Sequence, residues 1–260
     1  MKIATWNING IKARLPNLEK WLAEASPDIA CLQEIKSVSE NFPSEVFEAM
    51  GYNVAVHGQK SFNGVAILSK LPFDEVIKGL PGNEADEQAR YLEAVISTET
   101  GAIRVASIYL PNGNPIDTPK YPYKLEWMEH LKNHASNLLK YEEPLVLAGD
   151  YNIIPTEKDV YDASKWLDDA LYLPQSKAAY HAILNLGLTS AFEATINRAH
   201  KYTFWDYQAG AWNKDNGIRI DHLLLSPQAT DKLNHCEIDR YTRGWEKPSD
   251  HVPIWIELDV

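Results

Sequence analysis

The sequence contains only two cysteines, Cys31 and Cys236, in 260 residues. Two cysteines are too few for a disulfide scaffold. Cys31 lies in an apolar run, so we expect a small buried hydrophobe rather than a reactive thiol. No apolar run approaches the roughly 20 residues of a membrane span, and segment 1–7 turns polar before a signal-peptide core could form. We therefore expect a cytoplasmic protein that does not enter the membrane.

Long polar tracts and low-complexity linkers are also absent. With 45% apolar residues, the chain is expected to build a substantial core rather than to be disordered. The basic excess that is usual in nucleic-acid-binding proteins is missing as well, because 36 acidic residues outnumber 25 basic ones and give a net charge of −11. This total permits a non-anionic partner, or carboxylates concentrated at a metal site with a local basic rim.

The chain does contain a buried strand that ends in two polar side chains. The apolar residues 145–148, bounded by Pro144 and Gly149, are typical of a strand buried on both faces. Asp150 and Asn152 follow directly. Because Asp and Asn also favour turns through bonds to their own backbone, this pair alone indicates either a turn or a site.

The same arrangement recurs at the ends or starts of other expected strands. The polar residues placed in this way are Asn7, Asn9, Glu34, Asp150, Asn152, Asp221, Asp250 and His251. Ligand sites in α/β sheets lie beyond strand ends, where several loops can converge. A set of four carboxylates, three carboxamides and one imidazole suits Mg²⁺ or Mn²⁺ rather than structural zinc, and such metals usually act on phosphate groups. Taken singly, Asn9-Gly10 could be a hairpin turn and His251 a surface histidine.

The remaining pattern predicts one domain, residues 1–260, with two sheets packed together and helices outside. Further strands are expected at 52–57, 64–69, 91–97, 103–109, 223–225, 233–239 and 252–258. Helical spacing spans 15–25 and 125–138, and segment 156–185 is expected to be mostly helical and irregular.

Six short motifs resemble those of a known family, in the family's order. They are WNING (6–10), LQEIK (32–36), YLPN (109–112), GDYN (149–152), RID (219–221) and PSDH (248–251). From residue 2 to about 258 the chain resembles the exonuclease III-type apurinic/apyrimidinic endonucleases of the endonuclease/exonuclease/phosphatase superfamily. The resemblance implies an α/β four-layer sandwich, in which two mixed β-sheets pack face to face with helices on both outer faces.

The resemblance also implies a metal site at one edge of the sheets. Glu34 would be the principal ligand of Mg²⁺, for which Mn²⁺ is a possible substitute, and Asn9 and Asp250 would lie close to the metal. Asp150 would either activate the attacking water or protonate the leaving oxygen, and both roles stay open.

The other family positions would orient or bind the scissile phosphate. Asn7 and Asn152 would orient Asp150 and the phosphate. His251 would contact a phosphate oxygen, and Asp221 would bond its other ring nitrogen, which favours the imidazolium. The remaining contacts to the phosphate would come from Tyr109 and, nearby, Asn112.

Two features favour DNA as the substrate over other phosphoesters. In the resemblance, Phe204, Ile218 and Ile220 would enclose a flipped abasic sugar, which leaves the stack cheaply because it has no base. Ile218 stands where some eukaryotic members have Trp, and we expect Trp205 to belong to the core. The second feature is a set of basic residues beside the motifs, namely Lys12, Arg14, Lys36, Lys60, Lys120, Lys124, Lys214, Arg219, Arg243 and Lys247. Lys12 and Arg219 are the best candidates for contacts to the DNA backbone.

The sequence thus predicts a Mg²⁺-dependent DNA-repair phosphodiesterase. It would incise double-stranded DNA 5′ to abasic sites, leave a 3′-hydroxyl and process blocked 3′ ends, as a monomer. One alternative is the same chemistry on a non-nucleic substrate, such as an inositol phosphate or a phospholipid headgroup. Another is a non-catalytic binding module on the same scaffold.

Overall fold

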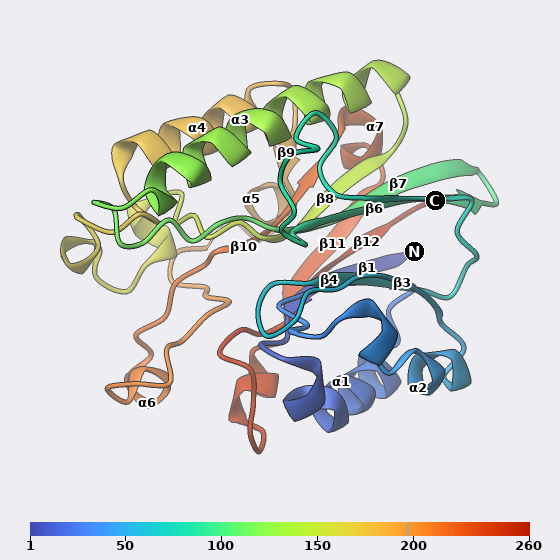
Figure 1. Cartoon of the computed structure of the whole chain (residues 1–260), viewed down its shortest axis with the longest axis horizontal. Coiled ribbons are helices and arrows are strands. Elements are labelled where there is room, and N and C mark those ends of the chain that lie inside the picture. Colours follow the sequence, from blue (N-terminus) through green and yellow to red (C-terminus); the bar gives the residue numbers. More distant parts are fainter. Residues whose placement is uncertain (197) are drawn as a thin grey trace.

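A computed structural model describes residues 1–196 and 198–260 of the chain. Two six-stranded sheets form its centre (Figure 1). In spatial order, the first sheet contains β11 (Leu233–Ile238), β12 (Ile254–Leu258), β1 (Lys2–Asn7), β2 (Ile29–Gln33), β4 (Val65–Ser69) and β3 (Asn53–His57). The second contains β5 (Glu75–Lys78), β6 (Tyr91–Thr98), β7 (Gly101–Tyr109), β8 (Leu145–Asp150), β10 (Asp221–Leu225) and β9 (Thr189–Ser190). Each sheet is mixed, because β1 and β2 run parallel in one and β7 and β8 in the other.

Helices cover the two outer faces of this pair of sheets (Figure 1). The outer side of the first sheet carries α1 (Ile11–Ala25) and α2 (Ser44–Ala49), and that of the second carries α3 (Lys120–Leu138) and α4 (Pro174–Leu184). Shorter helices are α5 (Ala191–Thr195), α6 (Ala211–Lys214) and α7 (Pro227–Thr230), with 3₁₀ turns at Ser39–Asn41, Leu139–Tyr141, Glu157–Asp159, Ala163–Lys165 and Arg240–Gly244. The four-layer α/β sandwich predicted from the sequence is confirmed. Within the described residues, no helix has both the length and the apolar character needed to cross a membrane.

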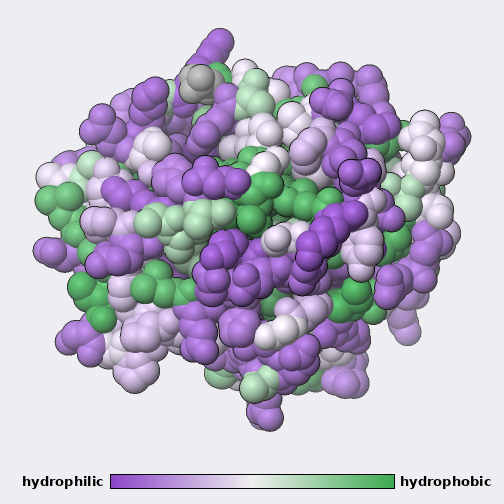
Figure 2. All heavy atoms as spheres, turned by 90° about the horizontal axis from the view of Figure 1, so that it is seen from above, coloured by the Kyte–Doolittle hydropathy of each residue, from purple (hydrophilic) through white to green (hydrophobic). Residues whose placement is uncertain are grey.

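Apolar side chains from the facing sides of the two sheets fill the space between them. Cys31 and Cys236 belong to this cluster, and both are buried and free. The expectation that Cys31 is a buried hydrophobe is therefore confirmed. Two further clusters hold the outer layers, with Trp127 of α3 packed on the second sheet and Trp21 of α1 on the first. Hydrophilic side chains predominate on the face of the molecule that Figure 2 shows from above.

Several local expectations from the sequence differ from the structure. Asn9 and Gly10 do not close a hairpin, because β1 pairs with β2 in parallel and α1 makes the connection between them. Strand β5 was not predicted from the sequence, because its residues are mostly exposed and do not alternate between apolar and polar. The last strand begins at Ile254 rather than at residue 252. In segment 156–185, α4 and two short 3₁₀ turns account for the expected helical character.

Candidate active site

Strands from both sheets end or begin at one edge of the sandwich, where their terminal residues meet. In the first sheet Asn7 is paired with Gln33, so Glu34 follows at the same end. In the second sheet Asp150 is paired with Tyr109 of β7 on one side and with Asp221 of β10 on the other. Register therefore brings residues far apart in the sequence to one place.

Gly149 allows Asp150 to occupy this position. A Cβ atom added at residue 149 would overlap the backbone of Ile108 on the neighbouring strand β7. Because only glycine lacks this atom, Gly149 lets the two strands approach closely just before Asp150. Steric crowding thus explains why glycine occupies this position of the GDYN motif.

Asn7 links the two sheets through its side-chain amide. Its Nδ2 atom donates hydrogen bonds to Oε1 of Glu34 and to Oδ2 of Asp150, both over 2.9 Å. Asn7 is fully buried, so these bonds form away from water and hold the amide in one orientation. The amide thereby sets the distance between a carboxylate of the first sheet and one of the second.

Asp150, Asp221 and His251 form a buried group beside this amide. Nδ1 of His251 lies 2.9 Å from Oδ2 of Asp221, and Nε2 of His251 lies 3.7 Å from Oδ2 of Asp150. One potential ligand atom from each of the three lies within 4.8 Å of the others, so the group is a candidate for metal binding. Burial alone would lower the pKa of His251, but the carboxylates of Asp221 and Asp150 outweigh it and raise that pKa.

The carboxyl of Asp150 has a raised pKa. The main cause is burial, and the charge of Asp221 acts in the same direction, whereas His251 and the amide of Asn7 oppose the shift. A raised pKa allows a carboxyl group to exchange a proton near neutral pH. The backbone N–H of Asn152 also donates to Oδ1 of Asp150 over 2.9 Å, which fixes the orientation of the carboxyl group.

Glu34, Asn9 and Asp250 form a second set of oxygen donors next to the first. Nζ of Lys36 lies 2.8 Å from Oε2 of Glu34 and 2.5 Å from Oδ1 of Asn9. Nδ2 of Asn9 donates to Oδ1 of Asp250 over 3.0 Å. Burial would raise the pKa of Glu34, but Lys36 and the hydrogen bond from Asn7 lower it overall. Glu34 is therefore held as a carboxylate.

Four residues of these loops adopt a left-handed backbone. The φ angle is 48° at Asn9, Glu34 and Asn152 and 51° at Lys36. Residues other than glycine rarely adopt this conformation, and such strain concentrates at functional sites. These four motif residues thus carry local strain, as do eight other non-glycine residues in 1–196 and 198–260.

Tyr109, Asn152 and Asn112 line the side of the site that belongs to the second sheet. Nδ2 of Asn112 donates to Oδ1 of Asn152 over 3.1 Å, and Nδ2 of Asn152 donates to the Leu110 carbonyl over 2.9 Å. Burial and then the charges of Glu34 and Asp150 raise the pKa of Tyr109, which keeps its hydroxyl protonated as a donor. Asn112 is exposed, so it can reach a ligand from the rim.

The structure places three expected basic residues in the interior. Arg219 is 1% exposed and its guanidinium lies 2.7 Å from Oδ1 of Asp159. Lys124 is fully buried and donates to the backbone carbonyls of Asn152 and Asn112 over 2.6 and 3.0 Å. Arg243 is also buried. The expectation that these three contact DNA at a surface rim is therefore corrected, because all three side chains are buried.

Other members of the expected basic set do lie at the surface. Lys12 is exposed in the first turn of α1, close in sequence to Asn9. The further exposed members are Lys60, Lys120, Lys214 and Lys247, whereas Arg14 and Lys36 are half-buried. Lys12 thus keeps the accessibility that its expected role requires.

The expected sugar pocket differs from the sequence interpretation. The ring of Phe204 lies against that of His251, with 4.9 Å between centroids, and it is only half-buried. Ile218 and Ile220 are 1% and 2% exposed and pack in a small core with Ile154. Of these three residues, Phe204 alone therefore offers accessible surface beside the site. The expectation that Ile218 and Ile220 line a sugar pocket is corrected, because both side chains are buried. Trp205 is fully buried, as expected.

Two supporting residues were not identified from the sequence. The hydroxyl of Ser249 donates to the Asn7 carbonyl over 2.7 Å and accepts from the His251 N–H over 3.1 Å, so it joins β1 to the PSDH loop. Its position directly before Asp250-His251 was the available signal. The Tyr207 hydroxyl receives a hydrogen bond from Arg14 over 2.9 Å and donates to the Pro248 carbonyl over 2.8 Å. No sequence signal pointed to Tyr207.

The chain is similar to known proteins along almost its whole length. The family model described as "Endonuclease/Exonuclease/phosphatase family" matches residues 4–251. Exodeoxyribonuclease III of Haemophilus influenzae is 34% identical over 99% of this chain and 100% of its own length. The structure of a Neisseria 3′ phosphatase, NExo, bound to product DNA hairpin, superposes with a TM-score of 0.96 at 36% identity, and that of an AP endonuclease from Archaeoglobus fulgidus with 0.94 at 36%. Both structural matches cover 100% of each chain. The chain belongs to the endonuclease/exonuclease/phosphatase family and is a DNA repair nuclease of the exonuclease III and AP endonuclease type.

Proposed function

We propose that this protein is a Mg²⁺-dependent phosphodiesterase that incises DNA 5′ to abasic sites and processes 3′ ends. The observation that carries the proposal is the pair of hydrogen bonds from Asn7 to Glu34 and Asp150, which joins a metal-binding carboxylate to a buried reacting one. The relatives named for exodeoxyribonuclease III, 3′ phosphatase and AP endonuclease activity support this substrate class.

The metal would be held by the oxygens of Glu34, Asn9 and Asp250 rather than by Asp150, Asp221 and His251, because the raised pKa of His251 keeps its ring protonated and a protonated imidazole has no lone pair for a metal. One observation supports this fit: Oε2 of Glu34 and Oδ1 of Asn9 already converge on a single cationic atom, Nζ of Lys36. Oxygen donors of this kind suit Mg²⁺, for which Mn²⁺ can substitute. Bound there, the metal supplies positive charge to the phosphate and acidifies a bound water.

Asp150 would exchange the proton that the reaction requires. Its raised pKa and its fixed orientation suit either removal of a proton from the attacking water or donation to the leaving oxygen. Asn7 and Asn152 would hold its two oxygens in place through the bonds described above.

The imidazolium of His251 would bind a phosphate oxygen. Asp221 accepts from Nδ1, so the Nε2–H faces the side of Asp150 and is available to a phosphate. Tyr109 would donate its hydroxyl to the same phosphate, and Asn112 would assist from the rim. These donors act in a buried site, where they stabilise developing negative charge more strongly than in water.

Lys12 and Phe204 would contact the DNA outside the phosphate site. Lys12 is accessible for a backbone phosphate, and the half-buried ring of Phe204 beside His251 offers an apolar surface to a base-free sugar. Because both sheets contribute residues to the site, we treat residues 1–260 as one catalytic domain, and we expect it to act as a monomer.

The test is cleavage of a DNA duplex with one synthetic abasic site. We expect incision 5′ to that site with Mg²⁺ and none with excess chelator. A matched duplex without the abasic site is the control for general nicking. If the abasic duplex survives while inositol phosphates or phospholipid headgroups are hydrolysed, the substrate assignment is wrong although the chemistry holds.

A further inference from the structure

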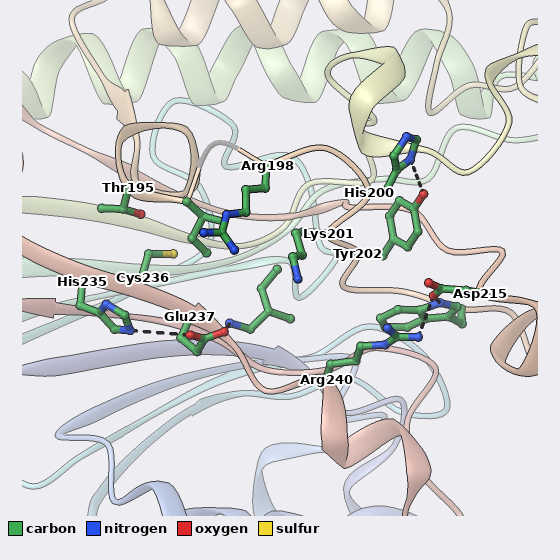
Figure 3. A pocket seen from close by; sticks show the side chains of 13 residues that line it. Thr195, Arg198, His200, Lys201, Tyr202, Asp215, His235, Cys236, Glu237 and Arg240 are labelled. Carbon is green, nitrogen blue, oxygen red and sulfur yellow. Dashed lines mark hydrogen bonds and ion pairs between the residues drawn. The ribbon is translucent and has the colours of Figure 1, made fainter.

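A cavity lies next to the segment that carries Phe204, and none of the residues described above as candidate catalytic or metal-binding residues lines it. Its volume is about 320 Å³, at the lower end of the range of roughly 300–1,000 Å³ for small-molecule sites. Its walls come from the end of α5, the loop 198–205 and strand β11 (Figure 3). The space therefore fits a small organic molecule.

Cationic side chains converge on this cavity in an otherwise acidic chain. Arg198 and Lys201 extend from the loop 198–205 into the opening above β11, and Arg240 lines one end of the cavity, where it points toward Asp215 (Figure 3). Neither Arg198 nor Lys201 forms an ion pair with a residue in 1–196 or 198–260. Two charges are thus available to an anion.

Both carboxylates in the lining, those of Asp215 and Glu237, already accept hydrogen bonds from other groups of the protein. Oδ1 of Asp215 accepts from Arg240 over 2.8 Å and from the indole N–H of Trp205 over 3.0 Å. Glu237 lies 3.8 Å from Nε2 of His235 and accepts from the Ile238 N–H over 3.2 Å. Their repulsion of an incoming anion is therefore partly compensated.

The rest of the lining combines the polar side chains of Thr195 and His200 with apolar and aromatic ones. Ile196 and Ile238 contribute half-buried aliphatic surface and Tyr202 contributes a small exposed part of its ring, whereas Cys236 and Trp205 have almost no exposed surface. Arg240 is held over the ring of Trp205, with 5.3 Å from its guanidinium carbon to the ring centroid. A fitting occupant would therefore combine an anionic group with a part that can lie against Ile196, Ile238 and the exposed part of Tyr202.

We propose that this cavity binds a nucleoside 5′-monophosphate. Its phosphate would pair with Arg198 and Lys201, and its base would lie against Ile196, Ile238 and the exposed part of Tyr202. Hydrolysis of the terminal phosphodiester at a DNA 3′ end releases this class of molecule. In that reaction water adds an oxygen to the phosphorus, the P–O3′ bond breaks, and the DNA keeps a 3′-hydroxyl. The identification with a reaction product rests on the proposed function, but binding to the cavity does not.

The cavity shares a wall with the active site. The backbone N–H of Trp205 donates to the Asp250 carbonyl over 2.9 Å, and the neighbouring Phe204 packs on His251. An occupant would stiffen the segment that carries Phe204. We therefore expect occupancy of the cavity to change the KM for abasic DNA.

The test is isothermal titration calorimetry of the full chain, in chelator, with dAMP, deoxyadenosine and inorganic phosphate. The double variant Arg198→Gln/Lys201→Gln should bind dAMP at least about tenfold more weakly, because hydrogen bonds to charged groups contribute this much. The control, Lys78→Gln/Lys140→Gln, removes two exposed charges outside the cavity and should bind like the unaltered protein. Both variants should unfold at an unchanged temperature, since all four residues are exposed.

Three outcomes would overturn the proposal. The first is undetectable binding of dAMP at millimolar concentration, or equal affinity in the cavity variant. The second is equal affinity for deoxyadenosine, since the phosphate would then not be recognised. The third is a cavity variant that loses affinity for abasic duplex but keeps its affinity for dAMP, which would assign these cations to the DNA path. Incision of the abasic duplex by the same preparations reports on the proposed function separately.

Discussion

The Nδ1 atom of His251 lies 2.9 Å from Oδ2 of Asp221, and both side chains are almost completely buried. The carboxylate therefore holds the imidazole ring in one orientation and stabilises its protonated form. Asp150 lies on the opposite side of the ring, 3.7 Å from Nε2. This geometry separates the anion that positions His251 from Asp150, for which we propose the proton-exchanging role.

Replacing Asp221 by Asn should impair the reaction rather than substrate binding. The amide keeps the shape but loses the charge, so the pKa of His251 should fall and the imidazolium should become less populated. We expect kcat on an abasic duplex to drop roughly 10²-fold or more, as when a donor to developing charge is lost. NMR titration of His251 gives the pKa directly. An unchanged pKa together with an unchanged kcat would show that the Asp221 carboxylate is dispensable.

Lys36 is expected to compete with the metal. Its ammonium contacts the oxygens of both Glu34 and Asn9, so Lys36→Gln removes a positive charge from the place where a divalent cation is expected. Mn²⁺ should then bind more tightly in the absence of DNA, as measured by calorimetry. Lys20→Gln, which removes an exposed charge on α1, is the matched control. Weaker Mn²⁺ binding in the Lys36 variant would contradict the assignment of Glu34 and Asn9 as ligands.

The Tyr207 hydroxyl should matter through the loops that it joins. It accepts from Arg14, which also donates to the Asn9 carbonyl, and it donates to the Pro248 carbonyl. Tyr207→Phe should therefore raise the Mg²⁺ concentration needed for half-maximal activity, with little change in the rate at saturating Mg²⁺. Tyr241→Phe removes a hydroxyl from another half-exposed tyrosine and is the control. Equal Mg²⁺ dependence in the two variants would rule out this role.

Lys124 should make stability depend on pH. Burial lowers its pKa from 10.5 to about 7, although Asp150 and Asp169 oppose the shift. The unfolded chain therefore binds more protons than the native one between about pH 7 and 10.5, so this residue makes the free energy of unfolding rise with pH in that window.

The variant Lys124→Met should lose this contribution. It should also be destabilised by roughly 1–3 kcal/mol, because the carbonyls of Asn152 and Asn112 lose their donor. Urea unfolding at pH 7 and pH 9 measures both effects. A difference between the two proteins that stays the same at both pH values would mean that Lys124 does not titrate in this range.

The sequence predicted where most of the polar site residues meet, because strand ends are local features. The apolar runs that precede Glu34 and Asp150 can be recognised in the sequence without any knowledge of tertiary contacts. Arg219 and Lys124 were misplaced because the burial of a charge depends on partners distant in the sequence. Asp159 lies 60 residues before Arg219, and the Asn152 carbonyl lies 28 residues after Lys124. Ile218 was misplaced for a similar reason, since its packing against Ile154 arises only in the folded chain.

The measurement that tests the central claim most directly is Mg²⁺-dependent incision of an abasic duplex by the variant Glu34→Ala. Glu34 is the carboxylate that Asn7 joins to Asp150. Without it, Mn²⁺ binding to the free protein should disappear and the incision rate should fall by orders of magnitude, because the charge stabilisation by the metal is lost. Glu126→Ala, at an exposed position on α3, should behave like the unaltered protein. A Glu34→Ala protein that binds Mn²⁺ and incises at the normal rate would contradict the claim that these residues form one metal-dependent phosphodiesterase site.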